Sequence, residues 1–178
     1  ALCAAIVALA ASACNTTHPD VPGMSWVAPG KFKMGYEGKG AKPNEKGLGE
    51  VSVDKGFYID KTEVTNKQYA EFMKASNHPA PAGWAGGKYP DGQDDFPIAG
   101  VTFDDAKAYA AWAKKRLPTE IEWEYAARGA KSNLYPWGGE WAASKRNNFE
   151  AGTGGPVKVG SYPDGKSWCG ALDMAGNV

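Results

Sequence analysis

Apolar residues recur at helical spacing in three segments of the chain, and each segment begins just after a threonine. Thr65 is followed three residues later by Gln68, and Thr119 by Glu122. This spacing lets the threonine hydroxyl and the longer side chain each bond a free backbone amide at a helix start. Thr102 precedes the middle segment, whose alanines and tyrosine recur at positions 106, 109, 110 and 113. The pattern predicts three helices in the middle of the chain.

Shorter alternating segments predict strands before the helices. Residues 24–35 indicate two short strands around a Pro29–Gly30 turn. Val51–Val53 alternates as a half-buried strand does, and residues 56–60 continue it. After residue 130 the chain is mostly turns with isolated strands. The predicted fold class is therefore α+β, a loop-rich single domain with no internal repeat.

The first residues have the character of an export signal. Residues 1–13 carry no charge and are too short to cross a bilayer as a helix, but they have the length of a signal-peptide apolar region. A small-residue run that ends in Cys14 resembles the lipobox of bacterial lipoproteins, in which this cysteine becomes lipidated. Residues 14–23 would then be the lipidated cysteine and a polar tether. Simple secretion after Ala13 and an uncleaved anchor are the alternatives.

Composition narrows the classes of partner. Lys+Arg and Asp+Glu are both 20, so the net charge of zero gives no electrostatic reason to expect nucleic acid. Of the three cysteines, Cys3 leaves with the predicted leader and Cys14 is the predicted lipid site. Cys169 then has no partner for a disulfide within the body. If Cys14 is lipidated, the protein is exported and anchored to a membrane, with the outer membrane or cell surface favoured.

Five strings of residues, in order along the chain, resemble the formylglycine-generating-enzyme family, also called sulfatase-modifying factors. The resemblance starts at about Met24 and defines a domain over residues 24–178. The strings are residues 57–69 (FYIDKTEVTNKQY), 97–106 (PIAGVTFDDA), 116–129 (RLPTEIEWEYAARG), 135–138 (YPWG) and 172–178 (LDMAGNV).

The resemblance implies a compact domain related to C-type lectin folds. Active members of the family oxidise a sulfatase cysteine to formylglycine with O₂, using copper held by two cysteines. Thiolates are soft ligands that select Cu(I), but Cys169 does not match either catalytic position. The family's pair lies beyond Val178, so we expect an incomplete domain, cut at both ends and without catalytic residues of its own.

The family also binds structural calcium, which prefers oxygen ligands at irregular turns. Asn177 and Val178 match one calcium loop of the family, and Asn148 and Phe149 match the start of a second. Residues 151–155 lack the acidic residue that the family places in the second loop. For each pair the alternative is an ordinary asparagine turn.

The remaining question is whether the protein is an enzyme. Glu120, Glu122 and Glu124 are close enough in sequence to suggest acid–base chemistry, but helix capping and an ion pair with Arg128 account for them more simply. One hypothesis is a copper-dependent oxidase that acts on a sulfatase-like polypeptide. The other is a non-catalytic lipoprotein that uses the same fold to bind an envelope protein or glycan.

Overall fold

The computed structural model describes residues 6–7, 18–38, 41–47, 49–147 and 152–178. Its strands and helices are β1 (Ile6–Val7), β2 (Met24–Val27), β3 (Gly30–Met34), β4 (Gly49–Val53), β5 (Phe57–Asp60), α1 (Asn66–Ser76), α2 (Phe103–Trp112) and α3 (Glu120–Arg128). Short 3-10 turns and irregular chain make up the rest. The α+β class and the loop-rich character are thus confirmed.

Each helix begins where the threonine pattern predicts. The N-cap threonines accept a hydrogen bond from the backbone amide three residues on, and the side chain at that position accepts one from the threonine amide. The sequence predicted this reciprocal cap for α1 and α3. Asp105 makes the same bond at the start of α2, because its carboxylate reaches the amide of Thr102 at 2.9 Å.

The four strands between residues 24 and 60 form two antiparallel ladders in succession, which we call the ribbon, with a break between them. β3 pairs with β4 so that Gly30 faces Val53, and β2 pairs with β5 so that Val27 faces Phe57. Between these pairs, two residues of the outgoing chain face three of the returning chain, as at a β-bulge. Pro29 lies at the break and has no amide hydrogen to donate to the ladder.

The break corrects two predictions. The strands on either side of Pro29–Gly30 exist, but they do not pair with each other, and they belong to different sheets. Val51–Val53 and the strand that follows are also separate, because residues 54–56 leave the ladder between them. A Cβ at Gly56 would overlap the ring of Trp26 across the ribbon, so this position needs glycine for close approach.

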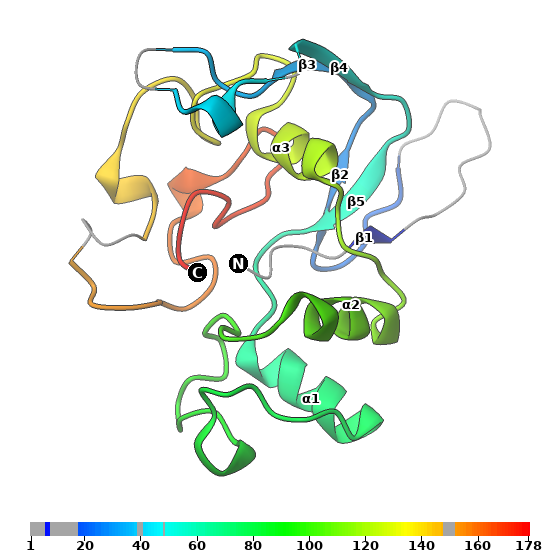
Figure 1. Cartoon of the computed structure of the whole chain (residues 1–178), viewed down its shortest axis with the longest axis vertical. Coiled ribbons are helices and arrows are strands. Elements are labelled where there is room, and N and C mark those ends of the chain that lie inside the picture. The colour runs from blue at the N-terminus through cyan, green and yellow to red at the C-terminus, as the bar shows by residue number, and fades with distance from the viewer. Residues whose placement is uncertain (1–5, 8–17, 39–40, 48, 148–151) are drawn as a thin grey trace.

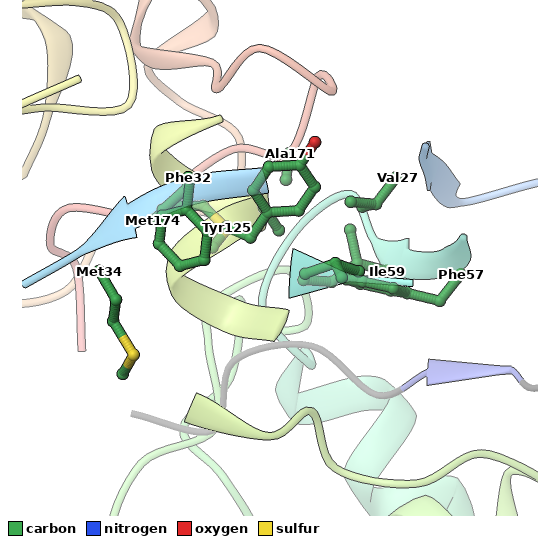
Figure 2. Close-up of a cluster of buried hydrophobic side chains, with 11 residues drawn as sticks. Val27, Phe32, Met34, Phe57, Ile59, Tyr125, Ala171 and Met174 are labelled. Carbon is green, nitrogen blue, oxygen red and sulfur yellow. The ribbon is translucent and has the colours of Figure 1, made fainter. Parts of the chain in front are cut away.

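Two hydrophobic cores result. The first, which we call the β–α3 core, lies between the ribbon, α3 and the C-terminal segment (Figures 1 and 2). Its buried members are Val27, Phe32, Met34, Val53, Phe57, Ile59, Tyr125, Ala126, Ala127, Ala171 and Met174. The second, the helical core, lies around α1 and α2 in the lower part of Figure 1. Its buried members are Val64, Tyr69, Phe72, Trp84, Ile98 and Tyr109.

Most of the predicted leader and tether lies outside the described residues, and so does Cys14. Ile6–Val7 forms the short strand β1, which pairs with β5. The described tether begins at His18, whose ring stacks on Trp26 with 3.6 Å between centroids. Tyr58 donates a hydrogen bond to the carbonyl of Pro19 at 2.6 Å. None of the described helices has the length and apolar character needed to cross a bilayer.

Candidate functional site

Asn177, a predicted calcium ligand, lies at the centre of a hydrogen-bond cluster. Its amide nitrogen donates to Glu63 at 2.6 Å and to the carbonyl of Val157 at 3.1 Å. Its amide oxygen accepts from the backbone amide of Val157 at 2.9 Å and from Asn147 at 3.1 Å. An asparagine side chain has two donor hydrogens and two acceptor lone pairs, so all four are used. Asn177 therefore joins Asn147 and Val157 to Glu63, just before the helical region.

Asn147, just before the predicted second calcium site, is also held in place by hydrogen bonds. Asn148 and Phe149 lie outside the described residues, but Asn147 is buried, with 4% of its surface exposed. Its carbonyl accepts from the backbone amide of Asn177 at 2.9 Å, and its side chain bonds Thr153 and Gly155. A Cβ at Gly176 would overlap that carbonyl, and φ of Gly176 is +148°. Glycine is thus required for the two loops to approach.

Glu63, like Asn147 and Asp173, belongs to this cluster although the sequence did not predict it. It is only 3% exposed, and its carboxylate accepts hydrogen bonds from the Asn177 side chain and from the backbone amide of Val178 at 3.2 Å. Burial raises the pKa of Glu63 to about 7, although the Asn177 bond opposes the shift. The carboxylate of Asp173 raises this pKa further. No local pattern marks Glu63, because its burial depends on residues more than 100 positions away.

Asp173 supports the same region from a strained backbone position. Its φ is +57°, a left-handed conformation that few non-glycine residues adopt. Its carboxylate accepts from the backbone amide of Gly160 at 2.6 Å, and burial raises its pKa. The adjacent Leu172 amide donates to the carbonyl of Lys61 at 2.7 Å. Residues 172–178 are therefore fixed along residues 61–63 by bonds at both ends.

The oxygen atoms of this cluster suit calcium by their chemistry, but some of them are already engaged in hydrogen bonds. Glu63, Asp173 and Asn177 supply the oxygen chemistry that calcium prefers. However, both acceptor positions of the Asn177 amide oxygen are filled by N–H groups, so a calcium ion there would have to displace them. No group of three or more His, Cys, Asp or Glu side chains suited to a metal occurs in the described parts of the chain. Calcium binding by Asn177 and Val178 stays a prediction.

Cys169 does not fit a copper site in this conformation. Its thiol lies against the β–α3 core and donates to the carbonyl of Ala126 at 3.4 Å, with the Ser167 hydroxyl 3.3 Å away. It is the only free cysteine among the residues that the structure describes. Cys169 alone does not form the two-cysteine copper site that the resemblance implies, and it supplies a structural contact instead.

A groove of about 690 Å³ begins beside Val178. It runs between the start of α2 and the start of α3, and its walls include Ile98, Val101, Phe103, Leu117 and Trp123. Phe103 is 70% exposed, which is unusual for a large apolar side chain. Acidic residues occupy the first turns of both helices and offset the positive ends of their dipoles. The groove therefore favours an apolar or basic group over an anion.

The three glutamates of α3 make separate contacts and do not form an acid–base pair. Glu122 accepts two hydrogen bonds from Arg116, at 2.6 and 2.7 Å, and also caps the helix. Glu124 pairs with Arg128 as predicted, and it accepts from the backbone amide of Gly35 at 2.7 Å. Glu120 alone lines the groove. The structural interpretation of Glu122 and Glu124 is confirmed.

A comparison with known protein families identifies the domain. The model for the sulfatase-modifying factor enzyme 1-like domain matches residues 10–178. The chain belongs to this family. A solved structure, PvdO from Pseudomonas aeruginosa, shares the fold with a TM-score of 0.74 and 27% identity, over 94% of this chain and 74% of that one. The resemblance found in the sequence is confirmed.

Curated members of the family differ in activity. The chain is 32% identical to a formylglycine-generating enzyme of Thermomonospora curvata, over 88% of this chain and 69% of that protein. It is 31% identical to the inactive C-alpha-formylglycine-generating enzyme 2 of Bos taurus, over 84% and 66%. It is 33% identical to a hercynine oxygenase of Mycolicibacterium smegmatis, over 90% and 45%. The chain thus spans about two thirds or less of the length of several relatives.

Proposed function

We propose that this protein is an oxidase of the family, which converts a cysteine of a sulfatase-like polypeptide into formylglycine. The observation that carries the proposal is the similarity to a formylglycine-generating enzyme over 88% of the chain. The groove beside Val178 supports it, because apolar walls and Glu120 at the start of α3 suit a peptide with a basic residue. Residues 24–178 would supply the scaffold and part of the substrate surface.

Copper would be held by a cysteine pair that residues 24–178 do not supply, because Cys169 is the one cysteine of that segment and its thiol bonds the backbone of α3. When bound, copper would supply the O₂ chemistry of the reaction. The chain's own residues would orient the peptide along the groove and fix the segment that ends at Asn177 and Val178. Calcium, if bound at that segment, would have a structural role.

The decisive experiment uses the full-length protein with copper, O₂ and a Cys-x-Pro-x-Arg peptide. The expected product is an aldehyde detected by mass, and omission of copper should abolish it. Cys169→Ala is the matched control and should leave the yield unchanged, because this thiol is assigned to the core. A full coding sequence without two nearby cysteines, or a loaded protein that makes no aldehyde, would rule the oxidase out.

We also propose an alternative to the oxidase, because a relative with 31% identity is named inactive. In that case the protein is a non-catalytic envelope lipoprotein that binds a protein or glycan partner. A lipid anchor at Cys14, which we propose places the protein at the outer membrane or cell surface, would favour this second function. Replacement of Cys14 by Ser should release the protein from the membrane fraction and abolish lipid labelling. Continued fractionation with membranes would contradict the anchor.

A further inference from the structure

A second hollow lies on the helical region, away from the groove at Val178. It has a volume of about 530 Å³ and lies between the C-terminal half of α1 and the loop of residues 84–94. Ala70, Met73 and Lys74 of α1 form one wall. Volumes of a few hundred cubic ångströms are typical of sites for small molecules. Neither the sequence motifs nor the proposed oxidase chemistry uses this pocket.

The pocket is held open by contacts within its own walls. Tyr89 packs edge-on against Trp84, with 5.1 Å between ring centroids, and its hydroxyl donates to Asp94 at 2.6 Å. The backbone carbonyl of Asp94 in turn accepts from the amide of Lys67 at 3.1 Å, on the first turn of α1. The loop is therefore fastened to the helix that it faces, which lowers the ordering cost of binding.

His78 is fixed in the pocket wall with one ring nitrogen engaged. Its Nε2 lies 2.8 Å from a carboxylate oxygen of Asp105, and its ring packs on Phe72 with 4.7 Å between centroids. The Asp105 contact engages Nε2 and leaves Nδ1 for another partner. Nδ1 has no hydrogen-bond partner among the described residues, so it can form a hydrogen bond with a hydroxyl group of a ligand, which both donates and accepts.

Charged groups of both signs share the pocket. Lys74, Lys88 and Asp91 line it, and their side chains make no hydrogen bond or ion pair with other described residues. Donors and acceptors in one hollow match hydroxyl groups, each of which can donate and accept. The aromatic ring of Tyr89 and the side chain of Met73 offer an apolar surface beside them.

We propose that this pocket is a binding site for a saccharide. A sugar ring combines an apolar C–H face with a rim of hydroxyl groups. The face would lie on Tyr89, and the hydroxyls would bond Lys74, Lys88, Asp91 and Nδ1 of His78. An anion would meet Asp91, and a simple cation would meet the two lysines, so neither suits the pocket as well as a polyhydroxylated ligand.

The test is a titration of the ¹⁵N-labelled full-length protein with N-acetylglucosamine, its β-1,4-linked disaccharide and maltose. The expected result is saturable shifts of backbone amides in residues 70–94 and of the His78 ring. Tyr89→Ala and Lys88→Ala should each weaken binding by about tenfold or more. Trp141→Ala is the matched control, because Trp141 is an exposed aromatic residue outside the pocket and its removal should not change the affinity.

Two results would overturn the proposal. One is the absence of saturable shifts with all three sugars at millimolar concentration. The other is binding that Lys88→Ala, an exposed substitution expected to fold normally, leaves unchanged. The aldehyde assay is read separately: Tyr89→Ala should retain the wild-type yield, so failure of the saccharide site and failure of the oxidase are distinguishable.

Discussion

The helical core and the β–α3 core are built from the chain in opposite ways. All buried members of the helical core fall between Val64 and Tyr109, within one continuous segment. Those of the β–α3 core are spread from Val27 to Met174 and come from the ribbon, α3 and the C-terminal segment (Figure 2). Local contacts form with little loss of chain entropy, whereas distant ones require long loops to close. The helical region can therefore form early, and the β–α3 region depends on its last residues.

The two regions meet at residues 60–64. Asp60, at the end of β5, accepts from Lys115 at 2.6 Å, just beyond α2. Lys61 and Glu63 accept from Leu172 and Asn177 of the C-terminal segment. Val64 then enters the helical core. We expect damage to one region to spread to the other only in part, because the shared stretch is short.

The largest expected effects come from matched truncations in the two cores. Ile59 is 0% exposed in the β–α3 core, and Ile98 is 1% exposed in the helical core. Each Ile→Ala change removes buried apolar surface and leaves a cavity, which costs about 2–5 kcal/mol of unfolding free energy. Urea denaturation should show losses of similar size for the two variants.

Hydrogen exchange measured on the Ile59→Ala and Ile98→Ala variants distinguishes the two regions. Ile98→Ala should raise exchange mainly in α1 and α2, and Ile59→Ala mainly in the ribbon, α3 and residues 167–177. If both variants raise exchange uniformly over the whole chain, the two cores form one cooperative unit and the comparison fails.

A smaller effect is expected from Glu63→Ala. The change leaves the Asn177 side-chain amide and the Val178 backbone amide without their acceptor, and each unsatisfied buried donor costs about 1–3 kcal/mol. At pH 6 we expect a net loss of about 2 kcal/mol, measured by thermal or urea unfolding. An exposed control, Glu50→Ala, should change stability by no more than about 0.5 kcal/mol. Equal losses for the two variants would contradict the buried role of Glu63.

The raised pKa of Glu63 also predicts that the stability of the protein depends on pH. Its pKa is raised from 4.5 to about 7 in the folded protein, so the unfolded chain releases this proton first as pH rises. Between these two values, stability falls with increasing pH, by at most about 1.4 kcal/mol per pH unit, and it levels off above pH 7. In calcium-free buffer, Glu63→Gln should flatten this slope. An unchanged slope would show that Glu63 is ionised in the fold.

Structural features that depend on neighbouring residues were predictable from the sequence, and those that depend on distant residues were not. The helix starts were predictable because a threonine and a residue three positions on act within one turn. The glutamates of α3 were predictable for the same reason. The partner of Tyr125 in the core, Phe32, was not, because 93 positions separate them and nothing in either neighbourhood specifies the other. Asn147 and Glu63 acquire their burial only when distant loops meet.

The smallest effects should come from the helix caps. Thr65→Ala in the helical region and Thr119→Ala in the β–α3 region each remove one side-chain bond to a free backbone amide. Each change should cost about 1 kcal/mol, and Thr→Ser at the same positions should restore most of it. Circular dichroism melts give the comparison. A Ser variant as unstable as the Ala variant would mean that the threonine methyl group matters more than its hydroxyl.

The central claim is that residues 172–177 are an integral part of the β–α3 region and that Asn177 joins them to Val157 and Glu63. Hydrogen exchange with mass detection, on wild type and Asn177→Ala, tests it most directly. Loss of protection in residues 57–63, 152–160 and 171–176, with α1 and α2 still protected as in wild type, is the predicted result. Unaltered protection in residues 152–160, or equal loss in α1 and α2, would contradict the claim.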